Sequence, residues 1–325
     1  MEIILFIRYN QKMIENIFIF GVSFFLIIKG ATLSTKYAFQ LAESYKLSKY
    51  VVGFIVIAVI SIIPEIFVSI NTAVIGVPSL GLGMLFGGNI ADMTLVFAIV
   101  IFFAGRGIKV DSKILKENVV YPFILLIPIV LGLDGYYSRW EGLGLIITGL
   151  IFYYLAFKNN SEKQIFPNTE IIKENNRLKD TIFLMLSMCL LLIGSHFVVT
   201  STISIANYLG VNSVVIGMLI VGVGTTMPEL FFCLSAIKKN HDSLAVGDIL
   251  GTVLADATVV IGLLALISPF YFPQKIIHSA GIFMVISSFL LFYFMRSGKT
   301  LSKKESYILL SFWILFVFVE ILINQ

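Results

Sequence analysis

The chain has 325 residues, of which 58% are hydrophobic and only 13% are charged. With a mean hydropathy of +0.97, it has too little polar surface to cover a soluble core, which excludes an ordinary soluble domain. The formal net charge is a modest +4. We therefore expect a lipid bilayer around the protein and no nucleic acid as a partner.

Ten apolar runs, of about the 20 residues needed to cross the hydrocarbon layer, follow one another along the chain. They fall near residues 17–41, 50–74, 78–104, 118–133, 141–157, 181–207, 212–237, 243–267, 276–295 and 305–323. One polar stretch, rich in Asn, Glu and Lys, separates five spans from the other five. The sequence thus predicts an all-α membrane protein with a first repeat (1–157), a cytoplasmic linker (158–180) and a second repeat (181–325).

Lysine and arginine gather on one side of the predicted spans, as they do in cytoplasmic loops. The loops that follow the odd-numbered spans hold 17 of the 23 Lys and Arg residues, and the opposite side holds 4. We therefore predict a multi-pass cell-membrane protein with both termini outside the cytoplasm. Five spans per half make the second half enter from the opposite side, and such inverted repeats with broken helices are typical of secondary transporters.

A short motif occurs twice, 164 residues apart, with no gap between the copies. Residues 58–65 read Ala-Val-Ile-Ser-Ile-Ile-Pro-Glu, and residues 222–229 read Gly-Val-Gly-Thr-Thr-Met-Pro-Glu. The same offset pairs Gly53 with Gly217, Gly83 with Gly247, Gly87 with Gly251, Asp92 with Asp256 and Thr94 with Thr258. The two halves therefore descend from one repeated unit.

The proline of each motif predicts a break in its helix. Pro64 and Pro228 lack an N–H and clash with the carbonyl four residues earlier, so they should free the carbonyls of Ile60 and Gly224. Inside lipid a freed carbonyl needs a partner, and a bound cation is one.

The glutamate of each motif shares a helix face with a hydroxyl one turn earlier. Ser61 precedes Glu65 in this way, and Thr225 precedes Glu229. Inversion brings the two faces together, which gives an all-oxygen shell with two negative charges. Such a shell suits Ca²⁺ better than Mg²⁺, because several protein ligands can wrap the larger ion.

A second carboxylate follows each glutamate by 27 residues, at the end of a glycine-rich segment. These are Asp92 and Asp256, and ionisable groups at that depth are costly and usually functional. The alternative is a protonated or hydrogen-bonded role in helix packing. One divalent ion would leave two of four carboxylate charges uncompensated, so we expect at least one carboxyl to hold a proton in that state.

The twin Pro-Glu helices and the glycine-rich spans after them, in two inverted five-span halves, resemble the sodium/calcium exchanger family of the calcium/cation antiporter superfamily, in its compact prokaryotic form. The resemblance implies ten transmembrane helices, with broken core helices in spans 2, 3, 7 and 8 and with spans 1 and 6 sliding across them. It implies a central calcium site and flanking sodium sites. The implied ligands are Glu65, Glu229, Ser61, Thr225, Asp92, Asp256, Thr226, Thr252 and the carbonyls of Ala58 and Gly222.

The first repeat departs from the family pattern, whereas the second fits it. Ile62 stands where a hydroxyl residue is usual, Gly88 where Ser opens the glycine-rich helix, and Asp92 where Asn is common. The sodium sites of the first repeat thus lose hydroxyls, which weakens the transfer of a three-sodium stoichiometry. An Asp at the position of Asp256 accompanies potassium use in potassium-dependent members, and Asp92 adds a group for proton coupling.

Two other residues within the spans receive structural interpretations. Asp248 lies near the start of span 8, where a carboxylate favours a helix N-terminus. Cys233 is interpreted as a small apolar packing residue.

We expect a calcium/cation antiporter that exports Ca²⁺ by coupling to inward movement of Na⁺ through alternating access. The alternatives are a proton- or potassium-coupled divalent cation exchanger of the same fold, an intramembrane aspartyl protease and a cation channel. A protease leaves the duplicated Pro-Glu turns unexplained, and a channel needs no opposing gradient. We expect a monomer, no enzymatic activity and no cofactor besides the transported ions.

Overall fold

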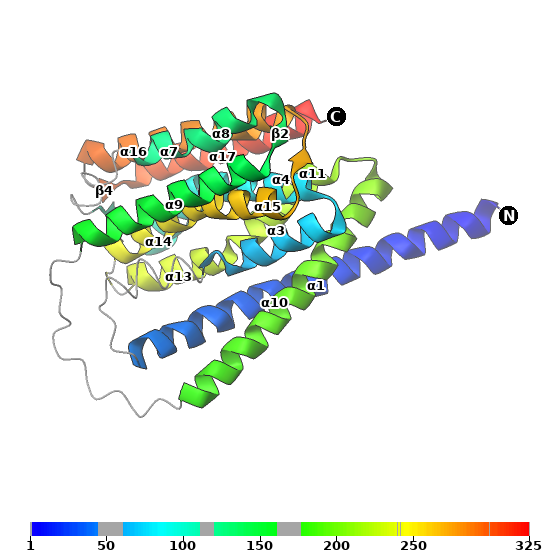
Figure 1. Cartoon of the computed structure of the whole chain (residues 1–325), viewed down its shortest axis with the longest axis horizontal. Coiled ribbons are helices and arrows are strands. Elements are labelled where there is room, and N and C mark those ends of the chain that lie inside the picture. The colour runs from blue at the N-terminus through cyan, green and yellow to red at the C-terminus, as the bar shows by residue number, and fades with distance from the viewer. Residues whose placement is uncertain are drawn as a thin grey trace.

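The protein is described by a computed structural model that covers residues 2–44, 61–110, 120–160, 177–238, 240, 242–298 and 300–324. Within these residues the elements are helices, joined by short turns and loops, and four two-residue strands, which confirms the predicted all-α class. The helices run roughly alongside one another in an elongated bundle (Figure 1).

The elements of the first half follow the predicted order of spans. They are α1 (Glu2–Ser44), α3 (Ile63–Ile75), α4 (Pro78–Ala91), the π-helical turn η2 (Asp92–Val96), α5 (Phe97–Ala104), β1 (Ile108–Lys109), α7 (Tyr121–Ile124), α8 (Leu126–Leu131), the 3₁₀ turn η3 (Gly132–Asp134), β2 (Tyr136–Tyr137) and α9 (Arg139–Asn160).

The second half repeats this order. Its elements are α10 (Arg177–Leu209), α11 (Ser213–Ile216), η4 (Gly217–Val221), α12 (Gly222–Thr225), α13 (Met227–Lys238), α14 (Asp242–Ala255), η5 (Asp256–Val260), α15 (Ile261–Ile267), β3 (Phe270–Tyr271), η6 (Ile277–Gly281), α16 (Ile282–Gly298), β4 (Thr300–Leu301) and α17 (Lys303–Ile323), where η4, η5 and η6 are π-helical.

Seven helical segments of the described chain are long and apolar enough to cross a membrane. They are Gln11–Ser34, Pro78–Ala104, Arg177–Leu209, Ser213–Lys238, Ala245–Ile267, Ile277–Ser297 and Lys303–Ile323. Shorter apolar helices cover Ile63–Ile75 and Tyr121–Asp134, and α9 lies at the fifth predicted span. The predicted second span is described only from residue 61 onward.

The 164-residue offset of the sequence reappears in the boundaries of the elements. The helices α4 and α14 begin at Pro78 and Asp242, and both end in a π-helical turn that starts at an aspartate, Asp92 or Asp256. A π-helical turn inserts one extra residue into a helix and is frequent at functional sites. The two halves therefore share backbone detail as well as order.

Two small antiparallel ladders join the halves at opposite ends of the bundle. The strand β1 pairs with β4, and β2 pairs with β3; β2 and β4, which are 164 residues apart, lie at opposite ends in Figure 1. Each ladder thus takes one strand from each repeat and connects the two halves.

The helices α1 and α10 cross each other along one face of the bundle (Figure 1). An added Cβ at Gly30 would lie 3.1 Å from the carbonyl oxygen of Ser187, and one at Gly194 would lie 3.0 Å from that of Ser23. Both pairs are related by the 164-residue offset, and the glycines let the two backbones approach closely. The crossing of α1 and α10 is therefore symmetric, because each helix contributes the same kind of glycine contact.

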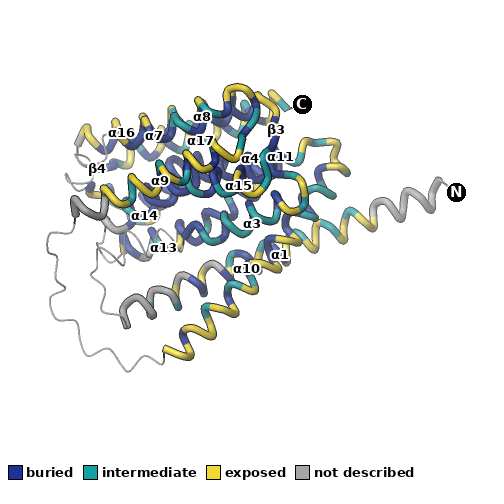
Figure 2. Tube along the Cα trace, in the orientation of Figure 1, coloured by how far each residue is buried: buried dark blue, intermediate teal, exposed yellow. Residues whose placement is uncertain are grey.

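Burial divides the helices into an inner and an outer group. In Figure 2 the segments of α4, α14 and α15 are mostly buried, whereas α1 and α10 expose much of their surface. The helix α1 has 43 residues, which is longer than the predicted span and corresponds to about 65 Å. That length exceeds the hydrocarbon layer of about 30 Å, so α1 continues past the predicted span at its N-terminal end.

Candidate ion-binding site

A new helix begins just before the proline of each motif, after a residue with nearly the same backbone angles in both repeats. The chain has backbone angles φ −76° and ψ −2° at Ile62, before α3, and φ −80° and ψ 0° at Thr226, between α12 and α13. Pro64 and Pro228 are each the second residue of the helix that follows. The predicted break is thus confirmed in the second repeat, whereas in the first repeat the residues before Ser61, Ile60 among them, lie outside the described residues.

The four predicted carboxylates are buried and turned inward. Glu65 and Asp256 are 3% and 2% exposed, and Glu229 and Asp92 are fully buried. Among the described residues, both oxygens of Glu229 and of Asp92 lack a hydrogen-bond partner, as does one oxygen of each of the other two. Within the described chain none of the four forms a salt bridge. Buried oxygens without partners are costly, and bound cations or protons would relieve that cost.

The carboxylates of the two repeats lie close enough for their charges to interact. Glu65 lies near the Thr225 hydroxyl of the opposite repeat. Glu229 lies near enough to Glu65 and Asp92 for their negative charges to repel one another. Asp256 lies near enough to the same two residues for the same repulsion. In this conformation no three acidic, His or Cys side chains of the described chain converge on one point at metal-binding distance. A shell here would therefore combine carboxylates with hydroxyl and carbonyl oxygens.

The threonine hydroxyls of the candidate site differ in their hydrogen-bond partners. Thr225 Oγ1 donates to the carbonyl of Gly222 at 3.0 Å, and Thr226 Oγ1 donates to that of Val223 at 2.9 Å. Thr252 Oγ1 is buried and has no hydrogen-bond partner in the described chain. In these residues the oxygen lone pairs remain available to a cation.

Glycines bring the two repeats into backbone contact beside the breaks. A Cβ at Gly87 of α4 would overlap the carbonyl of Met218 in η4, and one at Gly222 would lie 2.7 Å from the carbonyl of Met84. A Cβ at Gly88 would lie 3.6 Å from both the Gly222 oxygen and the Thr226 methyl. The structure therefore groups Gly88, Gly222 and Thr226; Ala58, the equivalent of Gly222, lies outside the described residues.

Asp248 belongs to this region, and its interpretation as a helix N-terminal residue is wrong. The helix α14 begins six residues earlier, at Asp242, and Asp248 is fully buried. Ser61 Oγ donates to Asp248 Oδ1 at 3.0 Å, and Cys233 Sγ lies 4.0 Å from Oδ2. The sequence did carry a signal for it, because Asp248, Thr252 and Asp256 are spaced by four and share one helix face.

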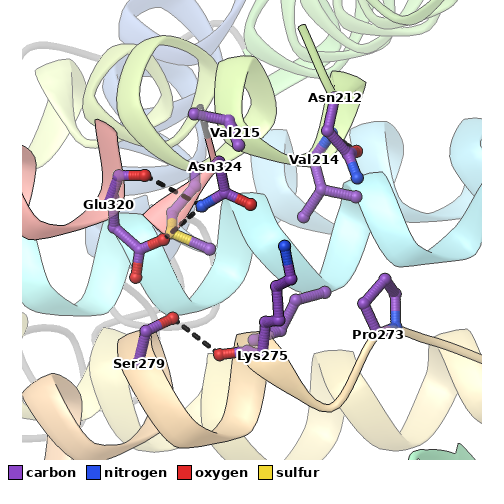
Figure 3. Close-up of a pocket in the computed structure, with 10 residues that line it drawn as sticks. Asn212, Val214, Val215, Pro273, Lys275, Ser279, Glu320 and Asn324 are labelled. Atoms are coloured by element: carbon purple, nitrogen blue, oxygen red, sulfur yellow. Dashed lines mark hydrogen bonds between the residues drawn. The ribbon is translucent and has the colours of Figure 1, made fainter. Parts of the chain in front are cut away.

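A separate cavity of about 150 Å³ lies between α11, η4, η6 and α17 (Figure 3). It is lined by Glu320, which is 1% exposed and accepts a hydrogen bond of 3.2 Å from Asn324. Lys275 lines the same cavity, and its Nζ donates to the carbonyl of Ile323 at 3.4 Å. None of the predicted ligands lines it. Since the cavity holds its own cationic group, it points to no ion site.

Comparisons with known proteins agree with these features. The sequence profile described as sodium/calcium exchanger protein matches residues 15–158 and 179–322. The two matched segments are again 164 residues apart, so the profile recognises each repeat separately.

Individual relatives cover almost the whole chain. The sodium/calcium exchanger MaX1 of Methanosarcina acetivorans is 25% identical over 348 residues, which cover 94% of this chain and 98% of that protein. An uncharacterized membrane protein of Methanocaldococcus jannaschii is 28% identical over 293 residues, or 86% and 92% of the two chains. A solved structure of the sodium-calcium exchanger NCX_Mj has a TM-score of 0.67 at 24% identity and covers 93% of this chain and 98% of its own, which shows a shared fold.

Proposed function

The chain belongs to the sodium/calcium exchanger protein family, because the family profile covers both of its repeats, and we propose that it exchanges Ca²⁺ for a monovalent cation, Na⁺ in preference, across a membrane. In the proposed direction Na⁺ moves into the cytoplasm and Ca²⁺ is exported from it. The observation that carries the proposal is the set of buried carboxylate oxygens, contributed by both repeats, that have no hydrogen-bond partner among the residues that the structure describes.

The central calcium site is formed by the two Pro-Glu motifs. Glu65 and Glu229 supply the negative charge, and the hydroxyls of Ser61 and Thr225 supply neutral oxygens. The contact between Glu65 and Thr225 supports this grouping, because it joins one motif to the other. Hard oxygen ligands in a site assembled from two helices suit a cation as large as Ca²⁺.

The monovalent cations bind on either side of that centre. One flanking site uses the Gly222 carbonyl and the Thr226 hydroxyl, which lie one turn apart in the same segment with Gly88 beside both. The symmetric site uses the Ala58 carbonyl and the Thr252 hydroxyl. Asp92 and Asp256 lie next to these sites, where they offset the charge of the cations or hold a proton.

Transport proceeds by alternating access in a membrane protein of ten spans, arranged as two inverted five-span repeats (1–157 and 181–325) with a cytoplasmic linker at 158–180. Both termini are outside the cytoplasm, and the transporter works as a monomer in the cell membrane. The helices α1 and α10 slide across the buried core. Two observations support this motion: α1 and α10 cross through a symmetric glycine contact, and Phe24 of α1 lies directly over Gly224 beside the break. Each ion biases the two states only through its different affinity for them.

The decisive experiment is uptake of radiolabelled Ca²⁺ into proteoliposomes with an imposed outward gradient of Na⁺, K⁺ or H⁺, one at a time. We expect Na⁺ to drive uptake, and we expect Glu229→Gln to abolish it. Glu320→Gln is the matched control, because it removes a buried carboxylate outside the proposed site. Uptake without any opposing gradient would indicate a channel, and uptake driven by H⁺ or K⁺ alone would change the coupling ion.

A further inference from the structure

One hydrogen bond crosses from the first Pro-Glu motif to the glycine-rich helix of the second repeat. Ser61 Oγ lies 3.0 Å from Asp248 Oδ1, although the residues are 187 positions apart. Ser61 is 3% exposed and Asp248 is fully buried. An ionised carboxylate only accepts hydrogen bonds, so the Ser61 hydroxyl is the donor.

The equivalent residues of the other repeat make no such bond. Thr225, which corresponds to Ser61, donates its hydrogen to a carbonyl of its own helix, that of Gly222. Met84 corresponds to Asp248 and has no carboxylate to offer. The bond is therefore a feature of one side of the site and does not follow from the repeat.

Donation to a carboxylate decides which part of the Ser61 hydroxyl is left for an ion. A hydroxyl has one hydrogen and two lone pairs. When the hydrogen points at Asp248, the lone pairs point elsewhere and can coordinate a cation. The nearby negative charge also makes the hydroxyl oxygen a better ligand, as partners behind metal ligands commonly do.

The helix that carries Asp248 also carries other parts of the candidate site. Asp248, Thr252 and Asp256 follow one another at four-residue spacing along α14 and into η5. Thr252 Oγ1 and one oxygen of Asp256 have no hydrogen-bond partner in the described chain. Asp248 makes no salt bridge there either, so its buried carboxylate is not accounted for by a basic side chain.

We propose that Asp248 is a positioning residue of the exchange site, which holds the hydrogen of the Ser61 hydroxyl so that the oxygen lone pairs face the transported cation. This inference rests on the proposed function. Asp248 then contacts the proposed ligand Ser61 and not the ion itself. Its loss should weaken the affinity for Ca²⁺ and change the maximal rate of exchange little.

The test compares Asp248→Met, which installs the residue of the first repeat, with Asp248→Asn, which keeps an oxygen acceptor for Ser61. Na⁺-driven Ca²⁺ uptake is measured in proteoliposomes over a range of Ca²⁺ concentrations. We expect Asp248→Met to raise the KM for Ca²⁺ roughly 10-fold, the usual cost of losing a partner behind a metal ligand. Asp248→Asn should rescue most of that loss, to within about 3-fold of the unmodified protein.

A double variant separates positioning from a general effect of charge. If Asp248 acts through Ser61, then Ser61→Ala combined with Asp248→Met should be no worse than Ser61→Ala alone. Additive effects, an unchanged KM in Asp248→Met, or an Asp248→Asn variant as impaired as Asp248→Met would each overturn the proposal. If Asp248→Met does not fold, Asp248→Ala removes the same acceptor without added bulk and takes its place in every comparison.

Two controls keep this test distinct from that of the proposed function. Glu320→Gln should leave the KM for Ca²⁺ unchanged, since it neutralises a buried carboxylate elsewhere. If the unmodified protein shows no cation-driven Ca²⁺ uptake, the proposed function itself fails. If the unmodified protein exchanges Ca²⁺ and the Asp248 variants have the same KM for Ca²⁺, the positioning role is refuted while the proposed function stands.

Discussion

In its Pro-Glu motif the first repeat has Ile62, whereas the second repeat has the hydroxyl residue Thr226 at the same place. The backbone angles at the two residues differ by only 4° in φ and 2° in ψ. Ile62 is buried among apolar side chains, while Thr226 donates its hydroxyl to the carbonyl of Val223. The two repeats keep nearly the same backbone at this residue, but the chemistry of its side chain has diverged.

The glycine-rich helices show the same contrast. The π-helical turns begin at Asp92 and Asp256 in both repeats, so the carboxylates are retained together with the backbone. One and two turns earlier the second repeat has Thr252 and Asp248, where the first has Gly88 and Met84. The repeats therefore share the backbone and the carboxylates of Asp92 and Asp256, whereas the hydroxyl and the carboxylate that precede Asp256 have no counterpart in the first repeat. The predictions below test which differences matter.

The largest effect is expected at the residues that the two repeats share. Glu65→Gln and Glu229→Gln should each lower Na⁺-driven Ca²⁺ uptake by at least about 100-fold, because each removes a charged oxygen ligand of the proposed central site. Uptake into proteoliposomes measures this, with the folded state of each variant checked by thermal melting. A variant that kept more than a tenth of the activity would show that the two halves are not equivalent at the centre.

A smaller effect is expected at a hydroxyl that only the second repeat retains. Thr252→Val keeps the shape of the side chain but removes the hydroxyl, which has no hydrogen-bond partner in the described chain. We expect the Na⁺ concentration for half-maximal exchange to rise about 10-fold, with a smaller change in the KM for Ca²⁺. Thr258→Val is the matched control, since its hydroxyl already donates to the carbonyl of Leu254. Equal effects of the two variants would remove Thr252 from the sodium site.

The converse change should restore a ligand to the first repeat. A Cβ at Gly88 would lie at an ordinary contact distance of 3.6 Å from its nearest atoms, so Gly88→Ser fits the space. We expect it to lower the Na⁺ requirement about 3-fold, the worth of one modest polar contact. Gly87→Ser is the contrasting variant, because its Cβ would overlap the carbonyl of Met218, and we expect it not to fold. A stable Gly87→Ser protein would contradict the backbone contact between α4 and η4.

The smallest effect concerns the two ends of the bundle, where the repeats also differ. At the end with β1 and β4, Arg106 binds both oxygens of Asp242 at 2.7 Å. Phe270 and Pro78 hold the equivalent positions at the other end, so no ion pair is formed by them. Arg106→Gln should cost about 1 kcal/mol, since the guanidinium is partly exposed, and should lower the melting temperature by about 2–4 °C. Lys304→Gln, at an exposed lysine, is the control.

The same ion pair predicts the sign of a pH effect. Partial burial raises the pKa of Asp242, but hydrogen bonds from Arg106 and from the N–H of Lys109 outweigh it and hold the pKa below its usual range. A lowered carboxyl pKa gives stability that is complete above the ordinary value of about 3.9 and is lost as the pH falls through the lowered value. Melting curves of the unmodified protein and of Arg106→Gln should therefore differ by a constant amount from pH 5 to 8 and converge in stronger acid.

Much of the fold followed from local patterns in the sequence. The apolar runs predicted the helices, since a segment in lipid must satisfy its own backbone. The two prolines predicted the breaks, because a missing N–H acts at its own position whatever surrounds it. The offset between Glu65 and Glu229 predicted that the halves correspond, and the boundaries of α4, α14 and the π-helical turns confirm this.

The part of the candidate site that escaped prediction depends on contacts between distant segments. Asp248 was interpreted from its place near the start of the eighth predicted span. That place does not reveal where α14 begins or which residue contacts Asp248. Its bond to Ser61 joins residues that are 187 positions apart, and it exists only because the fold packs a segment of the first repeat against α14 of the second. No periodicity of one segment records that packing.

The repeat, the helix-breaking prolines and the four shared carboxylates can be read from residue types and their spacing along one chain. Which hydroxyl meets which acceptor, and so the bond between Ser61 and Asp248, depends on how distant segments pack. The physical reason is that a hydrogen bond requires its two atoms within about 3 Å, and only the crossing of helices from opposite repeats sets that distance.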